Sequence, residues 1–186
     1  MAPDDIRRIH SETGVSALLS LQHDDCLDYW GIDYRMLYRT GEELGLRMER
    51  CPIRDFDVDD MRRQLSAAVS LLTNLRSLGH QVYVHCTAGL GRSSVTVLGY
   101  LTLIEGLSPD RAIHLIRKGR PGAVPAWEAY DGFRNDMIER YRKAIERRAY
   151  ELYESGVHRN ANADWYQAQA EVLRSAFTHE NSGPGP

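Results

Sequence analysis

The sequence has little cysteine, no excess of charge of either sign and no long hydrophobic run. Its three cysteines, Cys26, Cys51 and Cys86, are scattered and form no CxxC pair. This argues against a disulfide framework or a zinc cluster and favours a reducing compartment. Lys and Arg number 23 against 26 Asp and Glu, so the charge points neither to nucleic acid nor to an anionic membrane.

Targeting and membrane signals are also missing. No apolar run reaches the ~18 residues of a membrane span, and the first five residues lack the basic and apolar regions of a signal peptide. Apolar residues make up 42% of the 186 and charged residues 26%, which is typical of a globular domain. We therefore expect a cytoplasmic protein that does not bind membranes or nucleic acid.

The hydrophobic pattern alternates between short strands and helices. The clearest helix is 59–79, where apolar residues recur at steps of three and four before Gly79. Strands are predicted at 15–21, 46–53 and 82–85, a loop at 22–33, and further helices at 4–12, 34–44, 92–105, 109–119 and from 126 to about 154. This order predicts an α/β fold, a short, mostly parallel sheet flanked by helices, with ligands beyond the carboxyl ends of the strands.

The last forty residues carry no chemistry but have helical periodicity. We expect a catalytic domain over 1–144, a helical hairpin over 145–180 with its turn near 156–162, and a disordered tail over 181–186. The hairpin is predicted from two apolar stripes, one of Ile145, Ala149, Leu152 and Tyr153 and the other of Trp165, Ala168, Val172 and Ala176.

The segment 82–93 carries the strongest chemical signal. A strand delivers Cys86 into a loop, and Arg92 opens the next helix. The loop N–H groups and the helix N-terminus form an anion cradle, and Gly89 and Gly91 are expected to adopt positive φ angles. Arg92 is suited to hold two phosphate oxygens, and the same field lowers the pKa of Cys86, making it a thiolate. Ser93 is placed to donate a hydrogen bond to the sulfur. The predicted phosphate-binding residues are Thr87, Ala88, Gly89, Leu90, Gly91 and Arg92.

A lone cysteine at a strand end is more often an inert core residue, but His85-Cys86-x5-Arg92-Ser93 is a specific pattern. It resembles the signature of the cysteine-dependent protein tyrosine phosphatases of the dual-specificity class. The resemblance implies a phosphocysteine mechanism without metal or cofactor. It also implies an aspartate general acid about thirty residues upstream. Asp55 lies 31 residues before Cys86 and is favoured. Asp57 is the main rival, and Asp59 and Asp60 fit the cap of the helix that follows.

A narrower resemblance covers residues 13–135. The segments 21–24, 28–33, 53–57 and 86–92, the last reading CTAGLGR, are similar to the plant glucan phosphatases, which act on starch. The resemblance implies that Tyr29, Trp30 and Phe56 line a glucan channel, where sugar rings stack on aromatic faces. The alternative is that Tyr29 and Trp30 pack against the sheet as core residues.

The sequence departs from this narrower pattern in three ways. Ser93 stands where those plant enzymes carry alanine, no carbohydrate-binding module follows, and the strand and turn that usually precede the first helix are missing. On the segments that do match, phosphorylated glucan is the favoured substrate. Phosphoprotein (phosphotyrosine, phosphoserine or phosphothreonine) and inositol phosphate remain alternatives. A non-catalytic binding module is disfavoured because Cys86, Arg92 and Asp55 are all present.

Two further segments resemble known features. Arg117, Lys118 and Arg120 resemble the basic helix end that supports the active site in dual-specificity phosphatases, although for Lys118 a helix-terminal charge opposing the macrodipole is the better explanation. Residues 148–153 and 164–171 resemble a helical segment of unknown function found in bacterial proteins. It suggests a bacterial source and a homodimer or docking contact through the hairpin.

Overall fold

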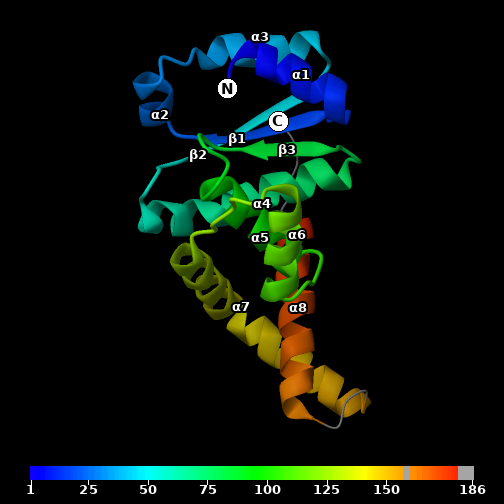
Figure 1. The fold of residues 1–186 in the computed structure, drawn as a ribbon. Helices are drawn as coiled ribbons and strands as arrows, with labels where there is room; N and C mark the ends of the chain where they lie inside the picture. Colours follow the sequence, from blue (N-terminus) through cyan, green and yellow to red (C-terminus); the bar gives the residue numbers. More distant parts are fainter. Residues whose placement is uncertain (157–159, 180–186) are drawn as a thin grey trace.

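The fold is built on a three-stranded parallel sheet (Figure 1). A computed structural model describes residues 1–156 and 160–179. The strands are β1 (Ala17–Gln22), β2 (Arg47–Ile53) and β3 (Val82–His85), in the order β2-β1-β3. Ala17 lies opposite both Arg47 and Val82. Every residue of β1 is buried, which explains why the central strand is almost continuously apolar in sequence.

Helices cover both faces of the sheet, so the predicted fold class is confirmed. The α1 helix (Pro3–Thr13) and α3 (Tyr34–Glu43) cover one face, where Leu18 packs with Ile6 and Leu37. The α4 helix (Val58–Ser77) and α5 (Arg92–Leu103) cover the other, where Leu19 joins the main core. Alternate side chains of β1 thus enter two different clusters, as the pleat of a strand requires.

The prediction of a loop over 22–33 was wrong for its first part. Residues Asp24–Tyr29 form the short helix α2. The ring of His23 caps it by accepting a hydrogen bond from the backbone N–H of Asp25 at 3.2 Å, and Leu27 is buried beneath it. Six residues are too few for helical periodicity to appear in the sequence.

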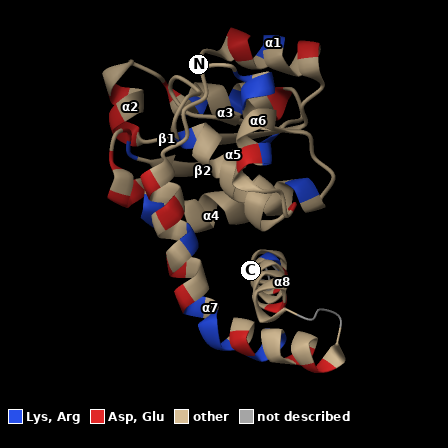
Figure 2. Ribbon diagram, turned by 60° about the horizontal axis from the view of Figure 1, so that its bottom comes forward, with Lys and Arg blue, Asp and Glu red and all other residues tan. Residues whose placement is uncertain are grey.

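The remaining helices lie at the carboxyl-terminal end of the chain. They are α6 (Pro109–Gly119), α7 (Trp127–Ser155) and α8 (Ala161–His179). The α7 helix runs without interruption past residue 144 and extends away from the sheet, and α8 returns along it (Figures 1 and 2). Of the expected turn, residues 157–159 lie outside the described part of the chain, as does the tail over 181–186.

The hairpin formed by α7 and α8 has two different contacts. At its distal part, Ile145, Leu152 and Ala168 form a small cluster of their own. At its proximal end, Leu173 and Phe177 of α8 belong to the main core, and the Phe177 ring lies 6.3 Å from that of Phe133. The end of α8 therefore completes the core of the catalytic part of the chain. Among the described helices, none is long and apolar enough to span a membrane.

Candidate active site

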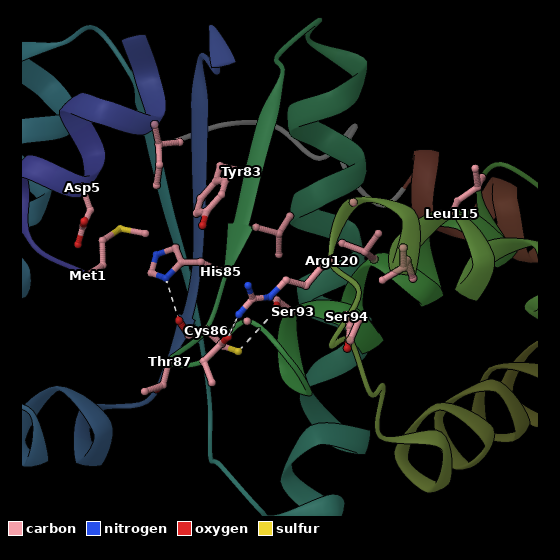
Figure 3. A pocket seen from close by; sticks show the side chains of 18 of the residues that line it. Met1, Asp5, Tyr83, His85, Cys86, Thr87, Ser93, Ser94, Leu115 and Arg120 are labelled. Carbon is pink, nitrogen blue, oxygen red and sulfur yellow. Dashed lines mark hydrogen bonds between the residues drawn. The ribbon is translucent and has the colours of Figure 1, made fainter. Parts of the chain in front are cut away.

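The loop from Thr87 to Gly91 connects β3 to α5 and is braced from three directions (Figure 3). The guanidinium of Arg120 donates to the carbonyl of Ala88 at 2.8 Å. The N–H of Val124 donates to the carbonyl of Leu90 at 3.0 Å, and the hydroxyl of Ser94 donates to the same carbonyl. These hydrogen bonds hold the carbonyls of Ala88 and Leu90 on the outer side of the loop. The backbone N–H groups of the loop can then point toward its centre, where an anion would bind.

Only one of the two loop glycines needs its conformational freedom. Gly89 has φ of 71°, as predicted, and this left-handed conformation is unfavourable for other residues. The prediction for Gly91 was wrong, because its φ is −96° and it forms the N-cap of α5. At Gly91 an added Cβ would come no closer than 4.0 Å to the carbonyl of Val124.

Cys86 lies at the base of this loop with only 6% of its surface exposed. Burial raises the pKa of its thiol. Hydrogen bonds from the Ser93 side chain and backbone, the charge of Arg92 and the backbone N–H of Gly89 outweigh burial, and the net pKa is lowered. The Ser93 hydroxyl lies 3.6 Å from the sulfur. The environment therefore favours the thiolate, which is the nucleophilic form of cysteine.

Arg92 is 1% exposed and holds several elements together. One terminal nitrogen donates to the carbonyl of Ile53 at 2.9 Å and contacts the sulfur of Cys26 at 3.4 Å. The other donates to Asp55 at 2.6 Å and to the Thr87 hydroxyl at 2.9 Å. Its Nε is buried, and no hydrogen-bond acceptor among the described residues reaches it. An oxyanion placed in the loop would satisfy this donor.

The four acidic candidates for the general acid have different positions. Asp55 is the one whose carboxylate contacts Arg92. Asp57 is the N-cap of α4 and accepts from the N–H of Asp60 at 2.8 Å, so the expectation that Asp59 or Asp60 is the cap was wrong. Asp60 in turn accepts from the N–H of Arg54 at 2.8 Å. The geometry leaves Asp55 as the carboxylate at the phosphate site.

His85, next to the nucleophile, is a neutral structural residue. Its ring Nδ1 lies 3.2 Å from the carbonyl of Cys86, and the ring stacks on Tyr83 with centroids 6.1 Å apart. Burial lowers the pKa of His85 to about 4. It is therefore uncharged at neutral pH and supports the loop rather than carrying a proton.

The three aromatic candidates for substrate contact are exposed. Tyr29, Trp30 and Phe56 are 80%, 62% and 95% exposed, so the alternative that Tyr29 and Trp30 are core residues is wrong. The Tyr29 and Trp30 rings meet edge to face at 5.1 Å. Phe56 has φ of 59°, a conformation uncommon for a bulky residue and often found at functional sites.

A cavity of about 620 Å³ connects Trp30 to the phosphate loop. Thr87 and the buried Gln22 line it, as do Asp33 and the exposed Met36. The Gln22 amide donates to the Thr87 hydroxyl at 3.3 Å, and its carbonyl oxygen is buried with no partner in the described part of the chain. This places a polar group and an aromatic side chain in a cavity that reaches Thr87, the residue after Cys86.

Sequence reasoning did not include two residues, Gln22 and Cys26, among those of the site. Gln22 ends β1 and Cys26 lies on α2, and both contact the phosphate loop or its arginine across more than 60 residues of sequence. The sequence offered one indication, which is the position of Gln22 at the carboxyl end of the central parallel strand. Ligands bind beyond such strand ends in parallel sheets.

With this geometry in view, the comparisons with known proteins become specific. The family model described as "Dual specificity phosphatase, catalytic domain" matches residues 19–143. The chain belongs to this family. The prediction of a cysteine-dependent phosphatase is confirmed at the level of the family.

Several members of the family are similar over much of this chain. The amyloplastic phosphoglucan phosphatase DSP4 of Castanea sativa is 33% identical over 147 residues, which are 77% of this chain and 38% of that protein. Laforin of Mus musculus is 32% identical over 55% of this chain and 31% of laforin. This chain thus corresponds to a minor part of either relative.

Among solved structures, the crystal structure of Tk-PTP in the active form is similar with a TM-score of 0.55. It is 26% identical and covers 72% of this chain and 84% of its own. The resemblance supports the same catalytic fold.

Proposed function

We propose that the protein is a metal-independent phosphate monoester hydrolase that works through a phosphocysteine intermediate. The observation that carries this proposal is the arrangement of three groups. Cys86 has a lowered pKa, the buried Nε of Arg92 has no acceptor among the described residues, and Asp55 is hydrogen-bonded to that arginine. Together they supply a nucleophile, an anion clamp and a proton donor.

In the first step, the Cys86 thiolate attacks phosphorus and the bond from phosphorus to the ester oxygen breaks. Loop N–H groups from Thr87 to Arg92 and the Arg92 guanidinium stabilise charge on the three equatorial oxygens. For its Nη2 to bind a phosphate oxygen, Arg92 exchanges its contact with Asp55 for the substrate. The released carboxylate of Asp55 takes up a proton from solvent and gives that proton to the departing alcohol oxygen.

In the second step, Asp55 removes a proton from water, and the water oxygen attacks phosphorus of the phosphocysteine. The sulfur leaves as a thiolate, and inorganic phosphate is released. Ser93 lies 3.6 Å from the sulfur, so its hydroxyl stabilises the departing thiolate by donating a hydrogen bond to it.

Phosphorylated glucan, such as a glycogen- or starch-like chain, is the substrate we propose. Exposed aromatic rings at Tyr29, Trp30 and Phe56 offer faces on which sugars stack, and the cavity from Trp30 to Thr87 gives a path to the phosphate loop. The similarity to DSP4, named as a phosphoglucan phosphatase, supports the same assignment. We place the enzyme in the cytoplasm, since its three cysteines are free.

The test is phosphate release without metal from phosphorylated amylopectin and from phosphotyrosine peptides. Wild type is compared with Cys86→Ser, which we expect to abolish turnover while retaining substrate binding. Trp30→Ala should lower kcat/KM on amylopectin at least about tenfold and leave a small aryl phosphate unaffected. Tyr153→Ala, an exposed aromatic on the distal part of α7, is the matched control.

The second candidate is a protein phosphatase. Cys86 is recessed, with 6% of its surface exposed, and a phosphotyrosine side chain is long enough to reach a recessed nucleophile. Preference for the peptides, with no effect of Trp30→Ala, would establish this alternative. Retention of most activity in Cys86→Ser would contradict the phosphocysteine mechanism for either substrate.

A further inference from the structure

Gln22 is a buried polar residue with one hydrogen-bonding group left unused. Its side-chain N–H donates to the Thr87 hydroxyl at 3.3 Å, and its backbone carbonyl accepts from Arg50 at 3.0 Å. The side-chain carbonyl oxygen is buried and has no partner among the described residues, and the residue as a whole is 1% exposed. An unpaired buried acceptor is costly, so a ligand that donates a hydrogen bond to it would be stabilised there.

This amide lies next to the groups that bind phosphate. The Thr87 hydroxyl oxygen accepts from Gln22 at 3.3 Å and from Nη2 of Arg92 at 2.9 Å. Thr87 is also the residue that follows the nucleophile Cys86. Gln22 is thus separated from Arg92 and the phosphate loop by one side chain. A substrate atom that pairs with its carbonyl oxygen must therefore lie close to the phosphate ester.

The cavity that Gln22 lines offers further acceptors and an aromatic side chain. Trp30, Asp33 and Thr87 line the same cavity. One carboxylate oxygen of Asp33 accepts from two backbone N–H groups of α3 at 2.9 and 3.3 Å. Its other oxygen has no hydrogen-bond partner in the described part of the chain. All four residues lie within 19–143, the part of the chain that matches the family model.

Unpaired acceptors are matched by hydroxyl groups, and an aromatic side chain beside them is matched by a sugar ring. A phosphoserine, phosphothreonine or phosphotyrosine side chain has no second hydroxyl to offer. We propose that Gln22 is a specificity-determining residue, whose side-chain carbonyl accepts a hydrogen bond from a substrate hydroxyl on a carbon next to the phosphate ester. This inference rests on the proposed function and names the part of the substrate that the site recognises.

The expected discrimination follows from the buried position of this carbonyl. A site built to bind a substrate hydroxyl rejects an analogue without that hydroxyl, because its own polar group is then left unpaired. The probes are glucose 3-phosphate and its 2-deoxy and 4-deoxy analogues, each of which lacks one hydroxyl next to the ester. Phosphate release by the full chain gives kcat/KM for each. Loss of the hydroxyl that pairs with Gln22 should lower kcat/KM at least tenfold, and loss of the other less than about threefold.

A substitution at Gln22 completes a cycle with these substrates. Leucine at this position fills a similar space and has no acceptor. In Gln22→Leu, glucose 3-phosphate and the poorly cleaved analogue should therefore have the same kcat/KM within about twofold, whatever the overall loss of activity. Met36→Ala is the matched control, because Met36 lines the same cavity without a strong acceptor. It should keep the ratio between the two sugars seen in wild type.

The outcomes separate this inference from the proposed function. Equal kcat/KM of wild type on all three sugars, or an unchanged ratio in Gln22→Leu, would overturn the role of Gln22. Neither result would affect the phosphocysteine mechanism, provided that wild type hydrolyses p-nitrophenyl phosphate and Cys86→Ser does not. If wild type released phosphate from neither the sugars nor p-nitrophenyl phosphate, the proposed function and this inference would both fail.

Discussion

Replacing Asp55 with asparagine tests the assignment of the general acid most directly. Asparagine keeps a carbonyl oxygen that can accept from Arg92, where the carboxylate now accepts at 2.6 Å, but it has no acidic proton to donate. The side chain is partly exposed at 35%, so the substitution is not expected to unfold the protein. The change therefore removes proton transfer and largely retains geometry.

The expected loss of kcat in Asp55→Asn follows from the contribution of general acid catalysis. This contribution is about 10²–10⁴-fold in rate, or about 3–5 kcal/mol of transition-state stabilisation. On a sugar phosphate, whose leaving alkoxide is strongly basic, kcat should fall by about this factor and KM should change little. On p-nitrophenyl phosphate the leaving phenolate needs little protonation, and the loss should be less than about tenfold.

Steady-state kinetics on both substrates measure this difference. Asp57→Asn is the matched control, because asparagine caps a helix as well as aspartate does, and it should retain wild-type activity. Equal losses on the two substrates, or a larger loss from Asp57→Asn, would refute the assignment of Asp55 as proton donor.

Three further predictions follow from burial and charge. Ser93→Ala should raise the pKa of Cys86, moving the acidic limb of the kcat/KM profile to higher pH, and lower kcat about tenfold; an unchanged limb would contradict it. His85 has a folded pKa of about 4, below its ordinary 6.5, so protons bind the unfolded chain first as pH falls. The contribution of His85 to the free energy of unfolding is complete above pH 6.5. Acidification to about pH 4 lowers that free energy by about 3 kcal/mol. Urea unfolding at several pH values checks this loss, which His85→Asn should reduce. Phe177→Ala should lower the free energy of unfolding by about 3–5 kcal/mol, because the ring is 1% exposed and lies against Phe133; a loss below about 1 kcal/mol would show that α8 does not complete the core.

The sequence by itself determined the local features of this protein. The strands β1 and β3 were predictable because they are short apolar runs, and β1 is buried along its whole length. The strand β2 was predictable because apolar residues alternate along it. The conformation of the loop after β3 was partly predictable because Cys86, Gly89 and Arg92 lie within seven consecutive residues, where the local backbone brings them together. The family resemblance supplied the sequence distance, about thirty residues before Cys86, at which the general acid is expected.

The tertiary structure decided what depends on contacts distant in sequence. Spacing favoured Asp55 over its rival Asp57 but left Asp57 as an alternative. The contact of Asp55 with Arg92 and the use of Asp57 as a helix cap distinguish the two positions. The link from Gln22 to Thr87 joins residues 65 positions apart, and no local pattern encodes such a contact.

The position of β3 in the sheet likewise depended on tertiary structure. A strand's neighbours are chosen by the packing of the whole sheet, whereas its sequence records only which side chains are buried. The apolar run at 82–85 predicted a strand, and only the order β2-β1-β3 placed that strand at an edge. Hydrophobic patterning thus fixed the elements, and long-range packing fixed which of them lie side by side.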